Sequence, residues 1–184
     1  MRENPELLNS QAIELAAHGE YVEAIACFKR ALEIEKSNYL LWYNLGITYR
    51  DAGKLQLARE ALEKAYLIED CDDEVIEMLA LVCFNCNMFD EALQYCAEGL
   101  ELNPLNAHIW NTMGVVYFNR SDYDLASEAF EHAITIHPYY YDALYNLRDT
   151  YAELGNKAGV EMCKEQMKQV SASQKNLASG GADA

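Results

Sequence analysis

The sequence predicts an all-α protein built from helical hairpins in tandem, and three observations predict it. Ala, Leu and Glu are frequent, whereas only 9 of the 184 residues are Gly and 3 are Pro, a composition that favours helix. Pro104 and Pro138 lie 34 residues apart, and Trp42 and Trp110 lie 68 apart, which is twice that period. Apolar residues recur at helical spacing inside each period. Rare residues that keep one period indicate an internal repeat.

Frames of 34 residues that start at residues 5, 39, 73, 107 and 141 align without insertion or deletion. The fourth position of the frame holds a large apolar residue: Leu8, Trp42, Ile76, Trp110 and Leu144. The twentieth position holds a small one: Ala24, Ala58, Ala92, Ala126 and Val160. Positions four, seven and eleven lie on one face of a helix, and positions twenty, twenty-four and twenty-seven lie on one face of a second helix. Each frame therefore predicts two helices that pack together.

The first two hairpins follow from this pattern and from the glycines between their helices. We expect them over 5–18 with 21–35 and over 39–52 with 55–69. Gly19 and Gly53 stand between the paired segments, where a helix commonly ends on a left-handed residue. Small residues at the eighth, twentieth and twenty-seventh positions allow the two helices to approach closely, and large residues fill the space beside them.

The third and fourth hairpins have different residues at the turn. We expect them over 73–86 with 89–102 and over 107–120 with 123–136. Asn87 and Ser121 take the place of the turn glycine, and Asn tolerates the left-handed conformation. Pro104 and Pro138 end the second helices, because Pro lacks the N–H donor and clashes inside a helix.

The fifth hairpin, over 141–154 with 157–170, has Gly155 at its turn and a more polar second helix. Arg148 and Lys164 stand where the other frames have a small and a large apolar residue. The second helix keeps one apolar stripe among charged residues, as in a helix that caps a repeat array. Residues 171–184 are small and polar, so we expect a disordered tail there.

Two frames carry a family resemblance. The second frame has Trp42, Leu45, Gly46, Tyr49, Ala58, Leu62 and Ala65 at the key positions. The fourth frame has Trp110, Met113, Gly114, Tyr117, Ala126, Phe130, Ala133 and Pro138. From residue 5 to about 170 the chain resembles the tetratricopeptide repeat (TPR) family. The resemblance implies a right-handed superhelical solenoid, a single domain over 1–170 with repeats 5–38, 39–72, 73–106, 107–140 and 141–170, and a last helix that serves as a C-terminal cap.

The resemblance also implies a concave groove, lined by the first helices, that holds a peptide or a helix of a partner. The groove residues on which we base the prediction are Tyr43, Asn44, Ile47, Arg50, Leu81, Phe84, Asn111, Val115, Phe118, Tyr145 and Asn146. Their apolar and aromatic members would form pockets, the asparagines would hydrogen-bond a peptide backbone, and Arg50 would contact an anion. The alternative is that some of these side chains pack between neighbouring hairpins.

The net charge of the chain narrows the kind of partner that it could bind. The chain has 14 Lys and Arg against 30 Asp and Glu, a formal net charge of −16 at pH 7. This balance argues against nucleic acid, whose phosphates require cations, and it favours a basic or apolar partner segment. The acidic run from Glu69 to Glu74 would add to that preference, or would simply be a solvated loop. Among the places that match the cationic grip of chaperone-binding TPR clamps, only Asn44 fits, so we reject that subclass.

The sequence offers little for catalysis. Cys83 and Cys86 have the C-x-x-C spacing of redox and zinc sites, but Cys83 and Cys96 occupy core positions of the frame, where Cys acts as a small apolar residue. Structural thiols are therefore the main interpretation, with a redox pair or a metal site as alternatives. No His has a nucleophile or a metal ligand at a suitable spacing. We expect no enzyme, no cofactor and no metal.

The predicted function is a non-catalytic scaffold or adaptor for protein–protein interaction. Two alternatives stay open: a self-associating homo-oligomer that uses the aromatic cluster Tyr139, Tyr140 and Tyr141, and the partner-selecting arm of a larger protein. The apolar runs are shorter than the roughly 20 residues that span a bilayer, so we expect no membrane insertion. Free thiols and the absence of a continuous apolar stretch in residues 1–20 predict a cytoplasmic protein.

Overall fold

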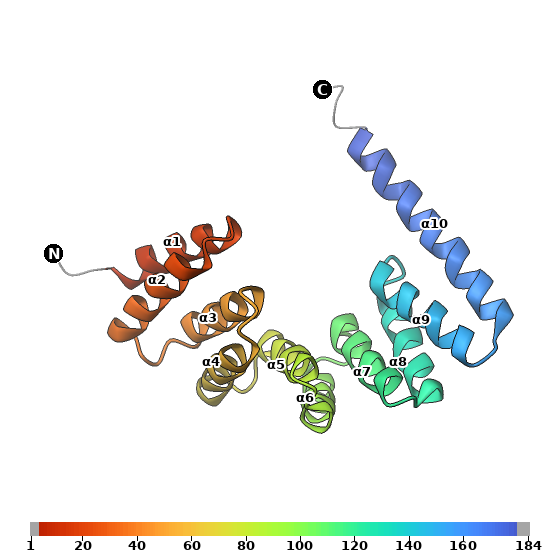
Figure 1. The fold of residues 1–184 in the computed structure, drawn as a ribbon, viewed down its shortest axis with the longest axis horizontal. Coiled ribbons are helices and arrows are strands. Elements are labelled where there is room, and N and C mark those ends of the chain that lie inside the picture. The colour runs from red at the N-terminus through yellow and green to blue at the C-terminus, as the bar shows by residue number, and fades with distance from the viewer. Residues whose placement is uncertain (1–3, 180–184) are drawn as a thin grey trace. The chain divides into compact units, whose positions relative to one another are not determined.

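The structure is a computed structural model that describes residues 4–179, with side chains over residues 4–172. The described residues form helices and no strands (Figure 1). In chain order the helices are α1 (Pro5–Ala17), α2 (Tyr21–Ile34), α3 (Tyr39–Asp51), α4 (Leu55–Ile68), α5 (Asp73–Asn85), α6 (Phe89–Leu102), α7 (Ala107–Asn119), α8 (Tyr123–Ile136), α9 (Tyr141–Glu153) and α10 (Lys157–Ser179). Each odd-numbered helix packs against the next one as a hairpin. The all-α prediction and its consecutive hairpins are confirmed.

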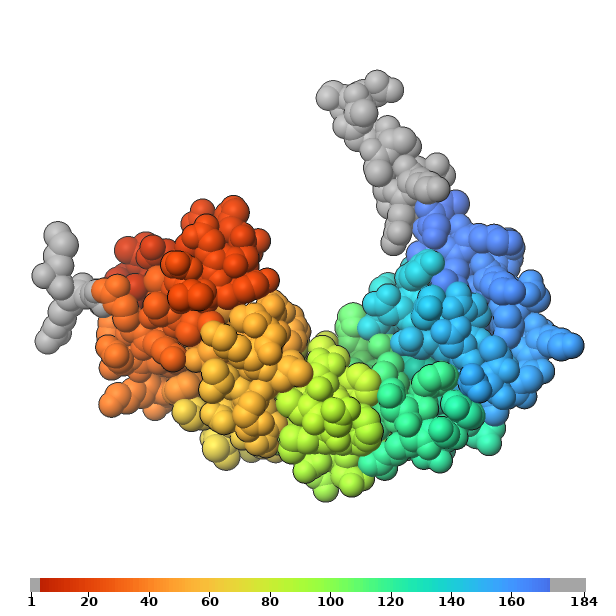
Figure 2. All heavy atoms as spheres, in the orientation of Figure 1, coloured from red at the N-terminus to blue at the C-terminus, as the bar shows by residue number. Residues whose placement is uncertain are grey.

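Packing divides the chain into two compact units, residues 1–102 and 103–184. The first unit holds α1 to α6 and the second holds α7 to α10, so the division falls between the third and fourth hairpins. Within each unit, neighbouring hairpins touch and form a continuous packed surface, red to yellow-green in the first unit and green to blue in the second (Figure 2). The single domain expected over 1–170 stays a prediction.

Local signals at the helix ends repeat with the frame. The first helix of four hairpins begins after an N-cap whose side chain accepts a backbone N–H, namely Asn4, Asn38, Asp72 and Asn106. Such caps satisfy N–H groups that lack a partner inside the helix. Asn87 and Ser121 have φ of 59° and 63°, the left-handed conformation that glycine adopts at the matching turns. The predicted turn chemistry is therefore present in all five hairpins.

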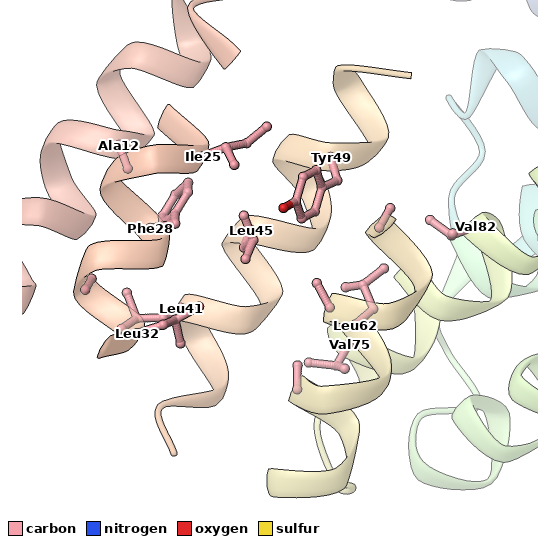
Figure 3. Packing of buried hydrophobic residues seen from close by; sticks show 14 of the residues in the cluster. Ala12, Ile25, Phe28, Leu32, Leu41, Leu45, Tyr49, Leu62, Val75 and Val82 are labelled. Carbon is pink, nitrogen blue, oxygen red and sulfur yellow. The ribbon is translucent and has the colours of Figure 1, made fainter. Parts of the chain in front are cut away.

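The core of the first unit consists of the apolar stripes that the frame predicts (Figure 3). Phe28 and Leu62 are 1% and 0% exposed, and they occupy the same frame position in successive hairpins. Gly46 lies against Leu62, since a Cβ at residue 46 would approach Leu62 Cγ to 2.6 Å. The glycine therefore sets how closely α3 and α4 approach each other.

The second unit repeats this arrangement around Phe130, which is fully buried and lies against Gly114. Helix α10 packs on α9 through Cys163, Met167 and Val170, part of the stripe predicted for it. The helix runs to Ser179, past its expected end at residue 170, so residues 171–179 are helical where we expected a disordered tail. The helix can continue through this stretch because residues 171–179 contain no Pro or Gly that would end it. The rest of the expected tail, 180–184, lies outside the described residues.

Candidate functional site

The predicted groove residues lie on the first helices of the hairpins, and we call the side of these helices that carries them the first-helix face of each unit. In the second unit this face carries Asn111, Val115 and Phe118 on α7 and Tyr145 and Asn146 on α9. Three of them, Val115, Phe118 and Asn146, line a small pocket of about 60 Å³. Phe130 of α8 and Asp149 of α9 complete its lining. The lining therefore combines three apolar side chains with one amide and one carboxylate.

Two amides connect α7 and α9 on this face. Asn146 Nδ2 donates to Asn111 Oδ1 at 3.0 Å. Each asparagine amide has two donor hydrogens and an oxygen with two lone pairs, so this single bond leaves the pair with further donor and acceptor capacity. Both side chains are half-buried, so they are held in place and still reach solvent.

Aromatic and charged side chains surround the pocket. Phe118 makes an edge contact with Tyr123, with ring centroids 5.4 Å apart. Arg148 stacks on Tyr145, its guanidinium carbon 4.1 Å from the ring centroid, and its Nη2 lies 2.7 Å from Asp149 Oδ1. Tyr145 is therefore partly covered by Arg148, and Asp149 already has an internal cation.

The first-helix face of the first unit carries Tyr43, Asn44, Ile47 and Arg50 on α3 and Leu81 and Phe84 on α5, and all six are half-buried. Asn44 Nδ2 donates to Asn9 Oδ1 of α1 at 3.1 Å, the counterpart of the amide pair in the second unit. Tyr43 packs against the core, and burial together with Glu74 and Glu77 raises its pKa to about 12. This face is therefore acidic beside Tyr43.

Arg50 is only partly available for the anionic contact that we predicted. Its Nη2 lies 2.8 Å from Asp51 Oδ1, and Nη1 lies 2.8 Å from the sulfur of Met78. Phe84 packs at a tilt against Phe89 of α6, with ring centroids 5.9 Å apart. Part of the predicted surface thus packs between neighbouring helices, which is the alternative that the sequence left open. The binding role of all eleven residues stays a prediction.

Profiles described as tetratricopeptide repeat match residues 9–74 and residues 107–140, which together make up more than half of the chain. The chain is a tetratricopeptide repeat protein. The matched segments contain the second and fourth frames, whose tryptophans, glycines and alanines carry the resemblance in the sequence.

This TPR protein is similar in sequence to part of an enzyme, and it is similar in fold to proteins of known structure. The probable UDP-N-acetylglucosamine–peptide N-acetylglucosaminyltransferase SPINDLY of Hordeum vulgare is 29% identical over 73% of this chain, which spans only 15% of that protein's length. A crystal structure of MamA aligns with a TM-score of 0.79 at 22% identity over 94% of both chains. YrrB, described as a TPR protein with an unusual peptide-binding site, aligns at 0.69 with 24% identity over 89% of this chain and 84% of its own. The structural matches show the fold, and together these findings support a protein-interaction module.

The cysteines of the TPR array lie mostly in its core. Cys83 and Cys96 are 1% and 0% exposed, and burial raises the pKa of Cys83 to about 11 and of Cys96 to about 12. Burial likewise raises the pKa of Cys163 to about 11. These three thiols are therefore protonated at neutral pH, which makes them weak nucleophiles.

The acidic run and the tyrosine cluster of the TPR protein are both at the surface. Glu69, Asp70 and Cys71 are exposed, and one ligand atom from each lies within 4.8 Å of the others, so the interpretation as a solvated loop and that as an acidic surface both remain. Tyr139 and Tyr141 are exposed, whereas the Tyr140 hydroxyl lies 2.9 Å from His108 Nδ1. Self-association through the tyrosines stays a prediction.

Phe130 and Asp149 belong to the pocket although we did not predict them as site residues. Phe130 stands at a core position of the frame, and no sequence signal shows that a buried ring also lines this pocket. Asp149 occupies a groove position, and the adjacent Arg148 is the one signal in the sequence that could have pointed to a charge pair there. None of the helices that the structure describes is long and apolar enough to cross a membrane.

Proposed function

We propose that this TPR protein is a non-catalytic interaction scaffold whose first-helix faces bind an extended peptide or a helix of a partner protein. The observation that carries the proposal is the pocket of the second unit, where Val115 and Phe118 meet Asn146 beside the amide pair that joins α7 to α9. An apolar pocket with a few fixed polar groups is the usual form of a recognition site.

The dimensions of the pocket bear on the side chain that it would take. Its volume of about 60 Å³ is near that of two water molecules, at roughly 30 Å³ each in the liquid. We propose that this space takes the end of a branched aliphatic side chain rather than a whole aromatic ring. The remaining amide groups of Asn111 and Asn146 would then bond the peptide backbone on either side of that residue.

Charge favours a basic partner segment. The chain carries a formal net charge of −16, and the carboxylates of Glu74 and Glu77 lie near Tyr43 on the first-helix face of the first unit. Opposite charge on a partner speeds encounter and disfavours acidic competitors. We therefore propose a segment in which Val, Leu or Ile is flanked by Lys or Arg.

The non-catalytic part of the proposal rests on the protonated core thiols and on a fold whose family members are generally not enzymes. The SPINDLY relative is an enzyme, but the match covers a small part of that protein. In a longer protein the same module would act as the arm that selects the partner.

The experiment is an immobilised array of short peptides in which Val, Leu or Ile is flanked by Lys and Arg, probed with the wild-type chain and two variants. The double variant Phe118→Ala with Asn146→Ala removes one pocket wall and the amide. We expect it to lower the affinity for the bound peptides at least tenfold. Leu125→Ala is the matched control, since Leu125 is 46% exposed on α8 and does not line the pocket. Circular dichroism checks that each variant folds. Equal binding by all three proteins would contradict the proposal.

A further inference from the structure

A larger pocket lies in the first unit and uses none of the predicted groove residues. It has a volume of about 480 Å³ and is formed by α2, α3, α4 and the residues that follow α2. Leu32, Leu45 and Tyr49 are buried beneath it, and Figure 3 shows these side chains on α2 and α3. Pockets that hold small-molecule ligands measure roughly 300–1,000 Å³, so this volume is sufficient for one or two large side chains of a partner.

The lining of this pocket is rich in lysine. Lys29, Lys36 and Lys64 all line it, although the whole chain has only 14 Lys and Arg. Two of them are held against aromatic rings: Lys64 Nζ lies 4.3 Å from the ring centroid of Trp42, and Lys29 Nζ lies 5.9 Å from that of Tyr49. A cation over an aromatic face is attracted by the ring and is less free to move away.

These three ammonium groups have no ion-pair partner within 4.0 Å among the residues whose side chains are described, whereas Arg50, Arg59, Arg148, Lys164 and Lys168 each have one. Two carboxylates, Glu33 and Glu60, also line the pocket, so the cations exceed the anions by one. An excess of unpaired cations over an apolar floor is complementary to a ligand that is both acidic and apolar.

We propose that this pocket is a second docking surface, distinct from the first-helix face, and that it binds a short acidic segment of a partner protein through a large apolar side chain. The apolar side chain would lie on Leu45, Tyr49 and Leu57, and flanking carboxylates would pair with Lys29 and Lys64. A long polyanion such as a nucleic acid is a poor ligand, because it would extend past the pocket. There the protein, with a net charge of −16, would repel it.

The repeat supplies an internal control for this site. Trp42 and Trp110 occupy the same frame position, and each indole N–H donates to a backbone oxygen six residues earlier, Lys36 O at 2.9 Å and Pro104 O at 3.0 Å. The ring of His132 stacks on Trp110 at 4.3 Å, where Lys64 stacks on Trp42. The two indoles therefore have matching positions and matching hydrogen bonds, but only Trp42 lines the lysine-rich pocket.

The experiment follows both indole N–H signals by ¹H–¹⁵N NMR while short peptides are added to the full chain. One pool carries Leu, Phe or Trp flanked by Asp and Glu, and the matched pool carries the same residues flanked by Lys and Arg. We expect the acidic pool to shift the Trp42 signal and to leave the Trp110 signal in place, and we expect added salt to weaken the effect. The basic pool should leave Trp42 unchanged.

Variants test the role of the lysines. Lys29→Glu with Lys64→Glu should lower the affinity for the acidic pool at least tenfold, and Lys64→Arg should retain it. Lys54→Glu is the matched control, because Lys54 is exposed at the start of α4 and does not line the pocket. Circular dichroism compares the folding of all variants. Loss of binding in the Lys54 control to the same degree would overturn the assignment.

Other occupants give different results, and each would overturn the proposal. Sodium phosphate that shifts Trp42 as strongly as the peptides would show a simple anion site. A Trp42 signal that moves with protein concentration in the absence of peptide, together with a dimer in light scattering, would show that a second copy covers the pocket. Binding of the acidic pool that survives the lysine variants and is lost with Phe118→Ala and Asn146→Ala would place acidic peptides on the first-helix face.

Discussion

Asn146 of α9 donates a hydrogen bond to Asn111 of α7, with 3.0 Å between Nδ2 and Oδ1. The pair is repeated in the first unit, where Asn44 of α3 donates to Asn9 of α1 at 3.1 Å. Both pairs join positions 35 residues apart in the chain, so they have the same place in the repeat. Each fixes two amides in advance, which lowers the entropy lost when a peptide binds them.

Replacing Asn146 should weaken peptide binding about tenfold and cost the fold only a little stability. The amide is half-buried, so Asn146→Ala loses one hydrogen bond at a net cost of about 0.5–1.5 kcal/mol in the free energy of unfolding. For a peptide selected on the array, we expect about a tenfold loss of affinity, which is about 1.4 kcal/mol. Urea unfolding and calorimetric titration measure the two effects, and an unchanged affinity would show that the amide does not contact the peptide.

Substitution of Gly114 should destabilise the protein because Phe130 packs against it. A Cβ at residue 114 would come within 2.6 Å of Phe130 Cε1, and that ring is fully buried. The first hairpin carries Ala12 and Phe28 at the same two positions, so α7 and α8 can move apart at a finite cost. We expect Gly114→Ala to lower the free energy of unfolding by about 1–3 kcal/mol. Adding Phe130→Ala, which removes the ring, should make the double variant more stable than additivity predicts, and strict additivity would refute the contact.

We expect the protein to be slightly less stable with Ser121 than with glycine at this position. Its φ of 63° is left-handed, a conformation in which a Cβ costs roughly 1–2 kcal/mol. Ser121→Gly removes this strain but makes the unfolded chain more flexible, so the expected gain is up to about 1 kcal/mol. Thermal unfolding measures it. Ser127→Gly, inside α8 and buried, should instead lose stability.

The cysteines should differ in their reactivity toward iodoacetamide at pH 8. Cys71 is exposed, whereas Cys83, Cys96 and Cys163 are buried and have raised pKa values. We expect Cys71 to be modified well before these three, although its hydrogen bond to Asp70 raises its own pKa and slows it relative to a free thiol. Mass spectrometry of peptides over time reads the order, and early modification of Cys83 would favour the redox interpretation of the C-x-x-C spacing.

Stability should fall at high pH because two tyrosines are held neutral. Burial raises the pKa of Tyr43 to about 12, and a hydrogen bond to Glu98 raises that of Tyr66 to about 12, whereas an unfolded tyrosine titrates near 10. Between these values the unfolded chain releases protons that the folded chain retains, so unfolding becomes easier as pH rises from about 10 to 12. Urea unfolding across this range measures the slope, and Tyr43→Phe should make it shallower. An unchanged slope would mean that Tyr43 titrates normally.

The repeat made most of the fold predictable. All helix starts match the frame, and the ends of α1 to α9 match within one residue, because Gly, Asn or Ser at the turns and Asn or Asp at the N-caps recur with the period. The length of α10 was missed, since polar residues 171–179 contain no residue that stops a helix. Composition alone does not distinguish a polar helix from a polar tail.

The candidate site was predictable only in part. Frame positions identified Val115, Phe118 and Asn146, which meet in one pocket. They did not show that Arg50 bonds Asp51 or that Arg148 covers Tyr145, because such contacts depend on rotamers rather than on the period. The lysine-rich pocket was missed because its cations come from different frame positions on α2, α4 and the residues after α2.

Peptide binding at the first-helix face is the central claim, and the side-chain amide signals of Asn111 and Asn146 test it most directly. They are followed by ¹H–¹⁵N NMR during titration with the strongest basic-aliphatic peptide from the array. We predict that both amides shift in a saturable manner, with the affinity measured by calorimetry, and that Phe118→Ala weakens the response. A peptide that binds while both amides keep their positions would contradict the claim, because binding would then lie elsewhere on the protein.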